Sequence, residues 1–299
     1  MPLLGTSASQ NTKSFLGLDS WTTKAAIPIG QYGLCGKAYG TDIYLIGGEW
    51  GDAGNYNYKY DTVANTWTQK ANMPTTRYGT VGGIIGDKFY VIGGVDNSAR
   101  NHNEMYDITN NTWTTKTVKP TADYWATGDV VGTKIYYFGN EGTSTKVEIY
   151  DSVANTWSTG TNSAYGSGYG QAVAVGNYIY KIAGGDTNSQ NQLTRYDTIN
   201  NSWTTLANLP VYITGHAAGL INGKYLQVAT GITTVSGTAT YYVAINLQYN
   251  IDTDTWSTKT NAPLGRIVAS GVGLGDKLYV FGGQASGNGH VTQTDVYTF

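Results

Sequence analysis

Aromatic and hydrogen-bonding side chains recur at matching points along this sequence, in a combination suited to binding a sugar or a peptide. Rings stack on apolar faces, while amides, carboxylates and guanidinium groups pair with hydroxyls or backbone groups. The alternative is that the tyrosines pack in a core with their hydroxyls hydrogen-bonded. The candidate ligand-binding residues are Tyr32, Trp50, Arg77, Tyr78, Asp96, Asp123, Tyr124, Trp125, Asn140, Glu141, Tyr169, Asp186, Arg266 and Gln284.

General acid–base catalysis is a second chemistry open to some of these residues. Glu49 and Glu141 each stand just after an apolar segment that ends in small residues. Either glutamate could serve as acid or base while Arg77 or Arg266 holds a substrate carboxylate. These four residues form the candidate catalytic set. Nothing in the sequence requires catalysis, so binding without catalysis is the leading hypothesis.

The motifs of other common chemistries are missing from the sequence. It contains no H-E-x-x-H, no G-x-S-x-G and no P-loop. Three histidines, His102, His216 and His290, stand far apart, and Cys35 is the single cysteine. Metal sites depend on convergent His or Cys ligands. We therefore expect no bound metal and no other cofactor.

Charge and hydropathy narrow the range of partners. Charged residues make up 13% of the chain, the formal net charge is -2, and no run of Lys or Arg occurs. Phosphate-backbone binding needs a clustered basic surface, so we expect no nucleic-acid partner. No apolar window is long enough for a membrane span, and the first residues lack the features of a secretory signal peptide. These observations leave the compartment open.

An internal repeat organises the whole sequence. Each unit has an apolar segment that usually ends in two glycines, as in Ile43–Gly48, then a tyrosine and, seven residues later, a tryptophan. Units of this length hold four short strands with polar turns, as in a propeller blade. The tyrosines are Tyr60, Tyr106, Tyr150, Tyr196 and Tyr249, and the tryptophans are Trp21, Trp67, Trp113, Trp157, Trp203 and Trp256.

The double glycine, the Tyr-Asp pair and the tryptophan together resemble the kelch repeat. The resemblance covers roughly residues 14–299 in six copies, one of them degenerate around Tyr225–Gly231, and leaves residues 1–13 as an N-terminal tail. It implies an all-β, six-bladed β-propeller in one domain, without accessory domains. Most of the repeated aromatic residues are then expected to be packing residues.

One repeat is split between the two ends of the chain. The last copy reaches Tyr297 and stops at Phe299 without a tryptophan, whereas Trp21 precedes the first complete copy. We predict that the strand containing Trp21 pairs with the strand containing Tyr297 and completes the last blade. Such pairing would remove the free strand edges. Trp21 is expected to be buried there.

The kelch resemblance also guides the functional expectation, because kelch propellers bind ligands at one mouth of the central channel. It implies a non-enzymatic recognition or scaffold module that binds a glycan or a protein at an aromatic mouth. The composition and the opening residues Met1–Ser7 are similar to those of extracellular adhesins and phage virion or tail proteins. The alternative is a sugar-modifying enzyme similar to the six-bladed kelch sialic-acid mutarotases.

Overall fold

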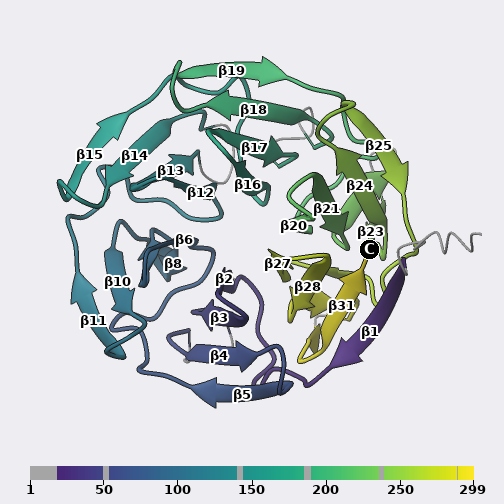
Figure 1. Cartoon of the computed structure of the whole chain (residues 1–299), viewed down its shortest axis with the longest axis horizontal. Helices are drawn as coiled ribbons and strands as arrows, with labels where there is room; N and C mark the ends of the chain where they lie inside the picture. Colours follow the sequence, from purple (N-terminus) through teal and green to yellow (C-terminus); the bar gives the residue numbers. More distant parts are fainter. Residues whose placement is uncertain (1–18, 50–53, 140–143, 185–189, 236–238, 288) are drawn as a thin grey trace, which may run out of the picture.

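Six four-stranded antiparallel sheets stand as blades around a central axis (Figure 1). The computed structural model describes residues 19–49, 54–139, 144–184, 190–235, 239–287 and 289–299. In this part of the chain every regular element is a strand, and no helix is long and apolar enough to cross a membrane. The prediction of an all-β propeller with six blades is confirmed.

Each blade runs from an innermost strand at the channel to an outermost strand at the rim. Blade 1 contains β2 (Cys35–Tyr39), β3 (Asp42–Ile46), β4 (Asn57–Asp61) and β5 (Thr66–Gln69). Blade 2 contains β6 (Val81–Ile85), β7 (Lys88–Ile92), β10 (Asn103–Asp107) and β11 (Thr112–Thr115). Blade 3 contains β12 (Thr127–Val131), β13 (Lys134–Phe138), β14 (Val147–Asp151) and β15 (Thr156–Thr159).

The second half of the ring follows the same order until the last blade. Blade 4 contains β16 (Gln171–Val175), β17 (Tyr178–Ile182), β18 (Leu193–Asp197) and β19 (Ser202–Thr205). Blade 5 contains β20 (Ala217–Ile221), β21 (Tyr225–Ala229), β24 (Asn246–Asn250) and β25 (Thr255–Thr258). Blade 6 contains β27 (Ser270–Leu274), β28 (Lys277–Phe281), β31 (Thr294–Thr298) and β1 (Ser20–Lys24).

Short strands outside the blades pair with one another in the connecting segments. They are β8 (Val95–Asp96), β9 (Ser98–Ala99), β22 (Ile232–Val235), β23 (Ala239–Tyr242), β26 (Arg266–Ile267), β29 (Gln284–Ala285) and β30 (Gly289–His290).

The second strand of each blade carries much of the core. In β3, Ile43 to Ile46 are consecutively buried, because both faces of the sheet pack against neighbouring blades. Strands covered on both faces read as continuous apolar runs instead of alternating ones. The outermost strand β5 is mostly exposed apart from Trp67, which is half-buried. The core therefore lies between the blades, in the middle of the ring wall.

A hydrogen-bonded clamp at the rim joins each blade to the segment that follows the preceding blade. The Oδ1 atom of Asn65 accepts hydrogen bonds from the Tyr60 hydroxyl at 2.6 Å and from the Ala25 N–H at 2.8 Å. The indole N–H of Trp67 donates to the Ala25 carbonyl at 3.0 Å. The same three bonds recur in the other five blades, where the acceptors are Asn111, Asn155, Asn201, Asp254 and Asp19.

The N-terminal strand closes the ring as predicted. β1 pairs with β31 in a register that places Trp21 opposite Tyr297, and Figure 1 shows the purple β1 beside the yellow β31. The Tyr297 hydroxyl donates to Asp19 at 2.8 Å, so the clamp of blade 6 is assembled from both ends of the chain. Closure leaves blade 6 with the same four strands as the other blades.

Trp21 is half-buried, which corrects the prediction that it is buried. It lies on an outermost strand, which has no further strand outside it, and its ring packs on Tyr297 with ring centroids 5.4 Å apart. The predicted tail, residues 1–13, lies outside the described residues.

Candidate ligand-binding mouth

Six residues form a closed ring of backbone hydrogen bonds around the channel, one just before the innermost strand of each blade. The bonds run in one direction: the N–H of Gly79 donates to the carbonyl of Gly33 at 3.1 Å, and the ring ends where the N–H of Gly33 donates to the carbonyl of Val268 at 3.0 Å. We call this ring the collar; its members are Gly33, Gly79, Trp125, Tyr169, Gly215 and Val268.

The collar requires a backbone conformation that most side chains avoid. All six residues have φ between 49° and 68°, in the left-handed region. Glycine adopts this conformation without steric cost, but Trp125, Tyr169 and Val268 do not, and each non-glycine residue there costs about 1–2 kcal/mol. Such strain is concentrated at functional sites. The collar therefore holds two large aromatic side chains at positions where glycine would be the least strained choice.

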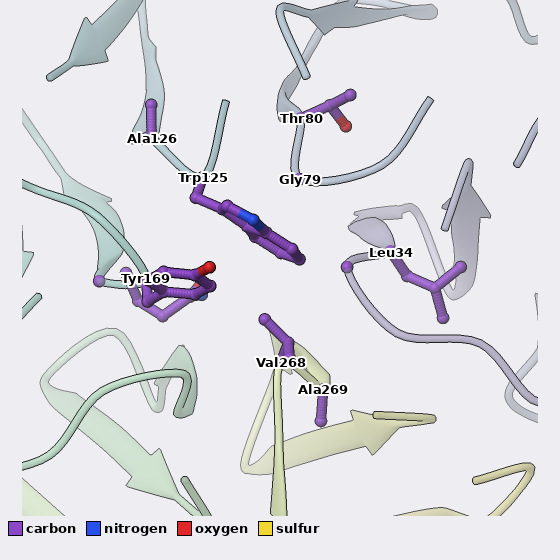
Figure 2. A pocket seen from close by; sticks show the side chains of 11 residues that line it. Leu34, Gly79, Thr80, Trp125, Ala126, Tyr169, Val268 and Ala269 are labelled. Atoms are coloured by element: carbon purple, nitrogen blue, oxygen red, sulfur yellow. The ribbon is translucent and has the colours of Figure 1, made fainter. Parts of the chain in front are cut away.

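Four half-buried aromatic rings cluster at the collar, and we call them the aromatic platform. Trp125 stacks on Tyr169 with centroids 4.8 Å apart, and its indole lies nearly parallel to the Tyr32 ring at 6.2 Å. Tyr78 meets Trp125 edge-on at 5.5 Å. Figure 2 shows the Trp125 side chain extending from its backbone toward the centre of the mouth, with Tyr169 beside it. The platform thus covers one mouth of the channel with aromatic surface.

A glycine of the collar makes room for the indole. A Cβ atom added to Gly33 would lie 2.8 Å from the Trp125 ring, closer than real side-chain contacts allow. The position of the Trp125 ring therefore requires glycine at position 33.

Below the collar the channel is narrow. A cavity of about 60 Å³ lies directly under Trp125, lined in part by Leu34, Thr80 and Ala269. Farther along the channel, Lys37 Nζ of blade 1 donates to Asp129 Oδ1 of blade 3 at 2.6 Å, beside a cavity of about 240 Å³. The upper cavity has room for only a few water molecules. A ligand larger than this is therefore expected to remain on the platform side of the collar.

A larger pocket, of about 420 Å³, lies beside the platform between blades 1 and 2. Its lining includes Glu49, Arg77, Tyr78, Asp96 and Asn97. We call it the mouth pocket. It is the largest of the cavities described for this part of the chain and the one best matched to a small ligand.

The carboxylate of Glu49 lies beside two tyrosines, Tyr32 and Tyr78. It accepts a hydrogen bond from the Tyr32 hydroxyl. Burial raises the pKa of Tyr78, and the charge of Glu49 and a hydrogen bond to it raise that pKa further. The pKa of Tyr32 is also raised, first by burial and then by its hydrogen bond to Glu49. Both phenols are therefore protonated at neutral pH, and the Tyr32 hydroxyl donates to the carboxylate.

The structure places two of the predicted site arginines inside the blades. Arg77 is fully buried and forms an ion pair with Glu104, while Arg266 is fully buried and pairs with Asp295 at 3.0 Å. Arg77 still belongs to the lining of the mouth pocket, but in both residues the guanidinium group already pairs with an acidic residue of its own blade instead of with a candidate catalytic glutamate. A sequence signal was present, because each acidic partner stands two residues before a repeat tyrosine.

Asp123 is likewise turned into its own blade. Its side chain is 4% exposed, pairs with Lys119 at 3.0 Å and accepts a hydrogen bond from the Tyr137 hydroxyl. Burial raises the pKa of Asp123, against the effect of the Lys119 charge. Lys119 also pairs with Glu148, so these groups form a buried ionic cluster in blade 3.

The other predicted site residues lie near the collar, in the connecting segments, or outside the described part of the chain. Tyr124 is half-buried next to the collar, Asp96 pairs with Arg100 at 3.2 Å, and the backbone of Gln284 pairs with those of Ile267 and His290. Of the candidate catalytic set, Glu49 and Arg77 line the mouth pocket, and Arg77 is buried and paired with Glu104. Four of the predicted residues lie outside the described part of the chain: Trp50, Asn140, Glu141 and Asp186.

Sequence reasoning missed several features of the mouth. Gly215 and Val268 complete the collar, and the His290 ring lies 5.0 Å from that of Tyr32. The glycines Gly33, Gly79 and Gly215 stand at one register, which was a usable signal. Residue type gave no such signal for Val268, because a β-branched residue rarely adopts a left-handed conformation. Within the described ranges, no three His, Cys, Asp or Glu residues converge as a metal site would require.

The chain is similar to known proteins in sequence and in fold. A family model described as the Attractin/LZTR1 β-propeller matches residues 43–286. Kelch-like protein 15 of Gallus gallus is 31% identical over 118 residues, a match that spans 38% of this chain and 23% of that protein. A solved structure titled "Structure of YjhT" has a TM-score of 0.80 at 19% identity and covers 91% of this chain and 95% of that one.

These similarities differ in what they establish. The kelch-like relative supports the kelch type of the repeats, although this chain spans less than a quarter of its length. The solved structure supports the propeller fold alone, because its sequence identity is low. The family model covers most of the repeats. The chain therefore belongs to the Attractin/LZTR1 β-propeller family.

Proposed function

We propose that this propeller is a non-enzymatic recognition module that binds a glycan or a protein at the aromatic platform and the mouth pocket. The observation that carries the proposal is the aromatic platform itself. Four rings lie half-exposed at one mouth, and two of them, Trp125 and Tyr169, are held on strained backbone. The collar imposes this backbone on all six positions, and glycine would adopt it without strain, so aromatic residues there favour a rigid binding surface over packing alone.

Saccharides and peptides both suit such a surface. An aromatic platform offers large contact area with little loss of side-chain freedom. The hydroxyls of Tyr32 and Tyr78 and the polar groups of Asp96 and Asn97 supply hydrogen-bonding partners beside it. The combination of apolar faces with a few fixed polar groups is typical of small-ligand pockets.

The test is a glycan array, followed by titration of any ligand found against wild type and the Trp125→Ala variant. An aromatic platform contributes on the order of 1 kcal/mol beyond area burial, so we expect a several-fold loss of affinity. Tyr39→Ala is the matched control, since Tyr39 ends the innermost strand β2 at the end opposite the collar and is 37% exposed.

Urea unfolding of the same variants separates binding from folding. Trp125→Ala should still unfold in one cooperative transition but at a lower urea concentration, because the half-buried indole loses its packing on Tyr169, Tyr32 and Tyr78 while the backbone strain stays. A variant that folds normally and binds every ligand as tightly as wild type would refute the platform as the site.

The enzymatic alternative gains no specific observation. A sugar-modifying reaction that clamps a substrate carboxylate needs a free guanidinium group, and the two candidates, Arg77 and Arg266, are engaged by Glu104 and Asp295. The comparisons add no support for a virion or tail setting, which stays an expectation from composition.

A further inference from the structure

The described part of the chain buries four basic side chains, and three of them pair with carboxylates. The fourth is Lys181 in β17 of blade 4, which is 3% exposed. Among the described residues, no carboxylate forms an ion pair with its amine. The paired residues are Arg77 with Glu104, Arg266 with Asp295, and Lys119 with Asp123 and Glu148.

The repeat shows which partner blade 4 lacks. The carboxylates of Glu104, Glu148 and Asp295 each stand two residues before the repeat tyrosine of their blade. In blade 4 the same position holds Thr194, which lies directly opposite Lys181 in the pairing of β17 with β18. The Thr194 hydroxyl is buried and, in the described structure, has no hydrogen-bond partner. Blade 4 thus keeps a buried base and has a neutral side chain in place of the carboxylate.

Three neutral oxygen atoms lie around the Lys181 amine instead. Its Nζ atom is 2.9 Å from Ser163 Oγ, 2.6 Å from the Tyr165 carbonyl oxygen and 3.1 Å from the Gly166 carbonyl oxygen. All three belong to residues 163–166, which we call the latch segment. It lies between β15 and β16 and leads to Tyr169 of the collar. The lysine therefore holds the piece of backbone that carries part of the aromatic platform.

Burial, and no charged neighbour, sets the protonation of Lys181. Its Nζ atom lies over the Trp203 ring, 5.6 Å from the centroid. The titratable residues on the elements packed there are Tyr165 of the latch segment, Tyr196 of β18 and Tyr136 of blade 3, and burial raises the pKa of Tyr196 and Tyr136. Burial lowers the pKa of Lys181 from its ordinary value of 10.5 to about 7.

From this arrangement we propose that Lys181 is a pH-sensitive positioning residue of the mouth: the latch segment closes over its uncharged amine and opens when the amine takes up a proton. Opening gives the ammonium group water, whereas the closed blade offers it no carboxylate. Because the latch segment leads to Tyr169, opening also loosens the collar and the ring stacked on Trp125. The inference rests on the proposed function, because the mouth is what the latch segment positions.

The direction of the pH dependence follows from proton linkage. Opening hydrates the amine and returns its pKa toward 10.5, whereas the pKa in the closed blade is about 7. Between these values the open form holds a proton that the closed form lacks. Closure therefore weakens as the pH falls from 10.5 toward 7 and changes no further below 7. One proton changes the opening equilibrium by at most about tenfold per pH unit.

The experiment is hydrogen exchange of the full chain without ligand, followed by NMR at about pH 7, 8 and 9 and corrected for the intrinsic exchange rates. The Ser163 amide donates to the Thr145 carbonyl at 2.8 Å, and the Tyr169 amide donates to the Trp125 carbonyl at 3.0 Å. The opening equilibrium at both amides should fall several-fold from pH 7 to pH 9, by up to about tenfold per unit.

The Met73 amide is the internal control. It donates the equivalent bond of blade 2, to the Asn55 carbonyl at 2.8 Å, and the buried cation of that blade, Arg77, is paired with Glu104. Its opening should change much less with pH than that of the Ser163 amide. Exchange through unfolding of the whole ring would move both amides together, so their difference isolates the latch segment.

Two variants remove the unpaired charge in different ways. Lys181→Met keeps an unbranched side chain without an amine, and Thr194→Glu supplies the carboxylate that blades 2 and 3 have at this position. In both variants the protection of the Ser163 and Tyr169 amides should no longer depend on pH between about 7 and 9. Either variant that folds is sufficient for the comparison with wild type.

Four outcomes would overturn the inference: pH-independent protection of the Ser163 amide in wild type, a Ser163 response that Tyr169 does not share, a Met73 response as large as that of Ser163, or a response that persists in Lys181→Met or in Thr194→Glu. No ligand is present in these measurements. Binding that is indifferent to Trp125→Ala would therefore refute the platform and leave the latch result unchanged, whereas failure of the latch would leave binding at the platform standing.

Discussion

The rim and the mouth of this ring are built on the same sixfold repeat but follow it to different degrees. At the rim, six indole N–H groups donate to six equivalent carbonyls, and the clamp acceptor is always Asn or Asp. At the mouth, the six collar positions hold three glycines, a tryptophan, a tyrosine and a valine. The rim thus joins neighbouring blades by six equivalent contacts, whereas the collar carries its aromatic side chains only before blades 3 and 4.

The largest expected effect is at the rim, where the ring closes. Deleting residues 1–24 would remove β1 together with the Asp19 acceptor and Trp21, and leave β31 as a bare edge. We expect a loss of about 4 kcal/mol or more in the free energy of unfolding, which is a large share of a typical domain's stability. Urea unfolding measures it, and deletion of residues 1–13 is the control, expected to behave as wild type. An unchanged midpoint in the longer deletion would mean that the ring closes without β1.

Replacing one indole of the rim tests whether the six clamps are equivalent. Trp21→Ala should cost about 2–3 kcal/mol, below the range for a fully buried aromatic residue, because the ring is half-buried. Trp113→Ala, at the same position of blade 2, should cost the same within about 1 kcal/mol, since both indoles donate to a linker carbonyl at 2.8 Å. A much smaller cost for Trp21 would show that the closing clamp is weaker than the others.

This contrast also explains how far the sequence could predict the molecule. Blade number, strand order and the pairing of β1 with β31 follow from repeated residues such as Trp21 and Tyr297, because repetition makes the packing positions visible. The direction of Arg77 was not predicted, because it depends on Glu104, a residue far away in sequence that becomes its neighbour only in the folded blade. The left-handed backbone at Trp125 depends on a hydrogen-bonded ring contributed by all six blades, and no local pattern encodes it.

The inner layer contains a buried histidine that should make stability depend on pH. His216 directly follows Gly215 of the collar, is fully buried, and burial lowers its pKa to about 3. The unfolded chain binds a proton below about pH 6.5, whereas the folded chain does so only near pH 3, so stability falls as the pH is lowered from 6.5 toward 3. At pH 5 the loss from this one group is about 2 kcal/mol.

Urea unfolding at several pH values in wild type and His216→Leu tests this contribution. The leucine variant should lose less stability between pH 6.5 and 5, while the acidic side chains that titrate at lower pH remain common to both proteins. Parallel pH profiles would show that His216 is protonated in the folded ring and would remove the prediction.

The smallest expected effects come from two glycine substitutions. They distinguish the cost of a strained backbone from the loss of space for the Trp125 ring. Gly33→Ala and Gly40→Ala both place alanine at a left-handed residue, with φ of 68° and 61°; Gly40→Ala should cost about 1 kcal/mol, and Gly33→Ala more, because its Cβ also collides with the Trp125 ring. Only Gly33 lies against the Trp125 ring, whereas a Cβ on Gly40 meets nothing within 4 Å. Ligand affinity at the mouth should therefore fall in Gly33→Ala alone; an equal change in both variants would uncouple the collar glycine from the platform.

The collar also links ligand binding to the lifetime of the closed ring. Its final hydrogen bond joins Gly33 of blade 1 to Val268 of blade 6, so the ring of bonds exists only after the last blade has docked. A chain that opens transiently at this seam would lose the collar and, with it, the backbone that orients Trp125. A ligand held on the platform should then slow the opening, by mass action on the closed state. Hydrogen exchange at the Gly33 amide, which donates the seam bond to the Val268 carbonyl, would report this slowing when measured with and without ligand, and equal exchange rates would exclude it.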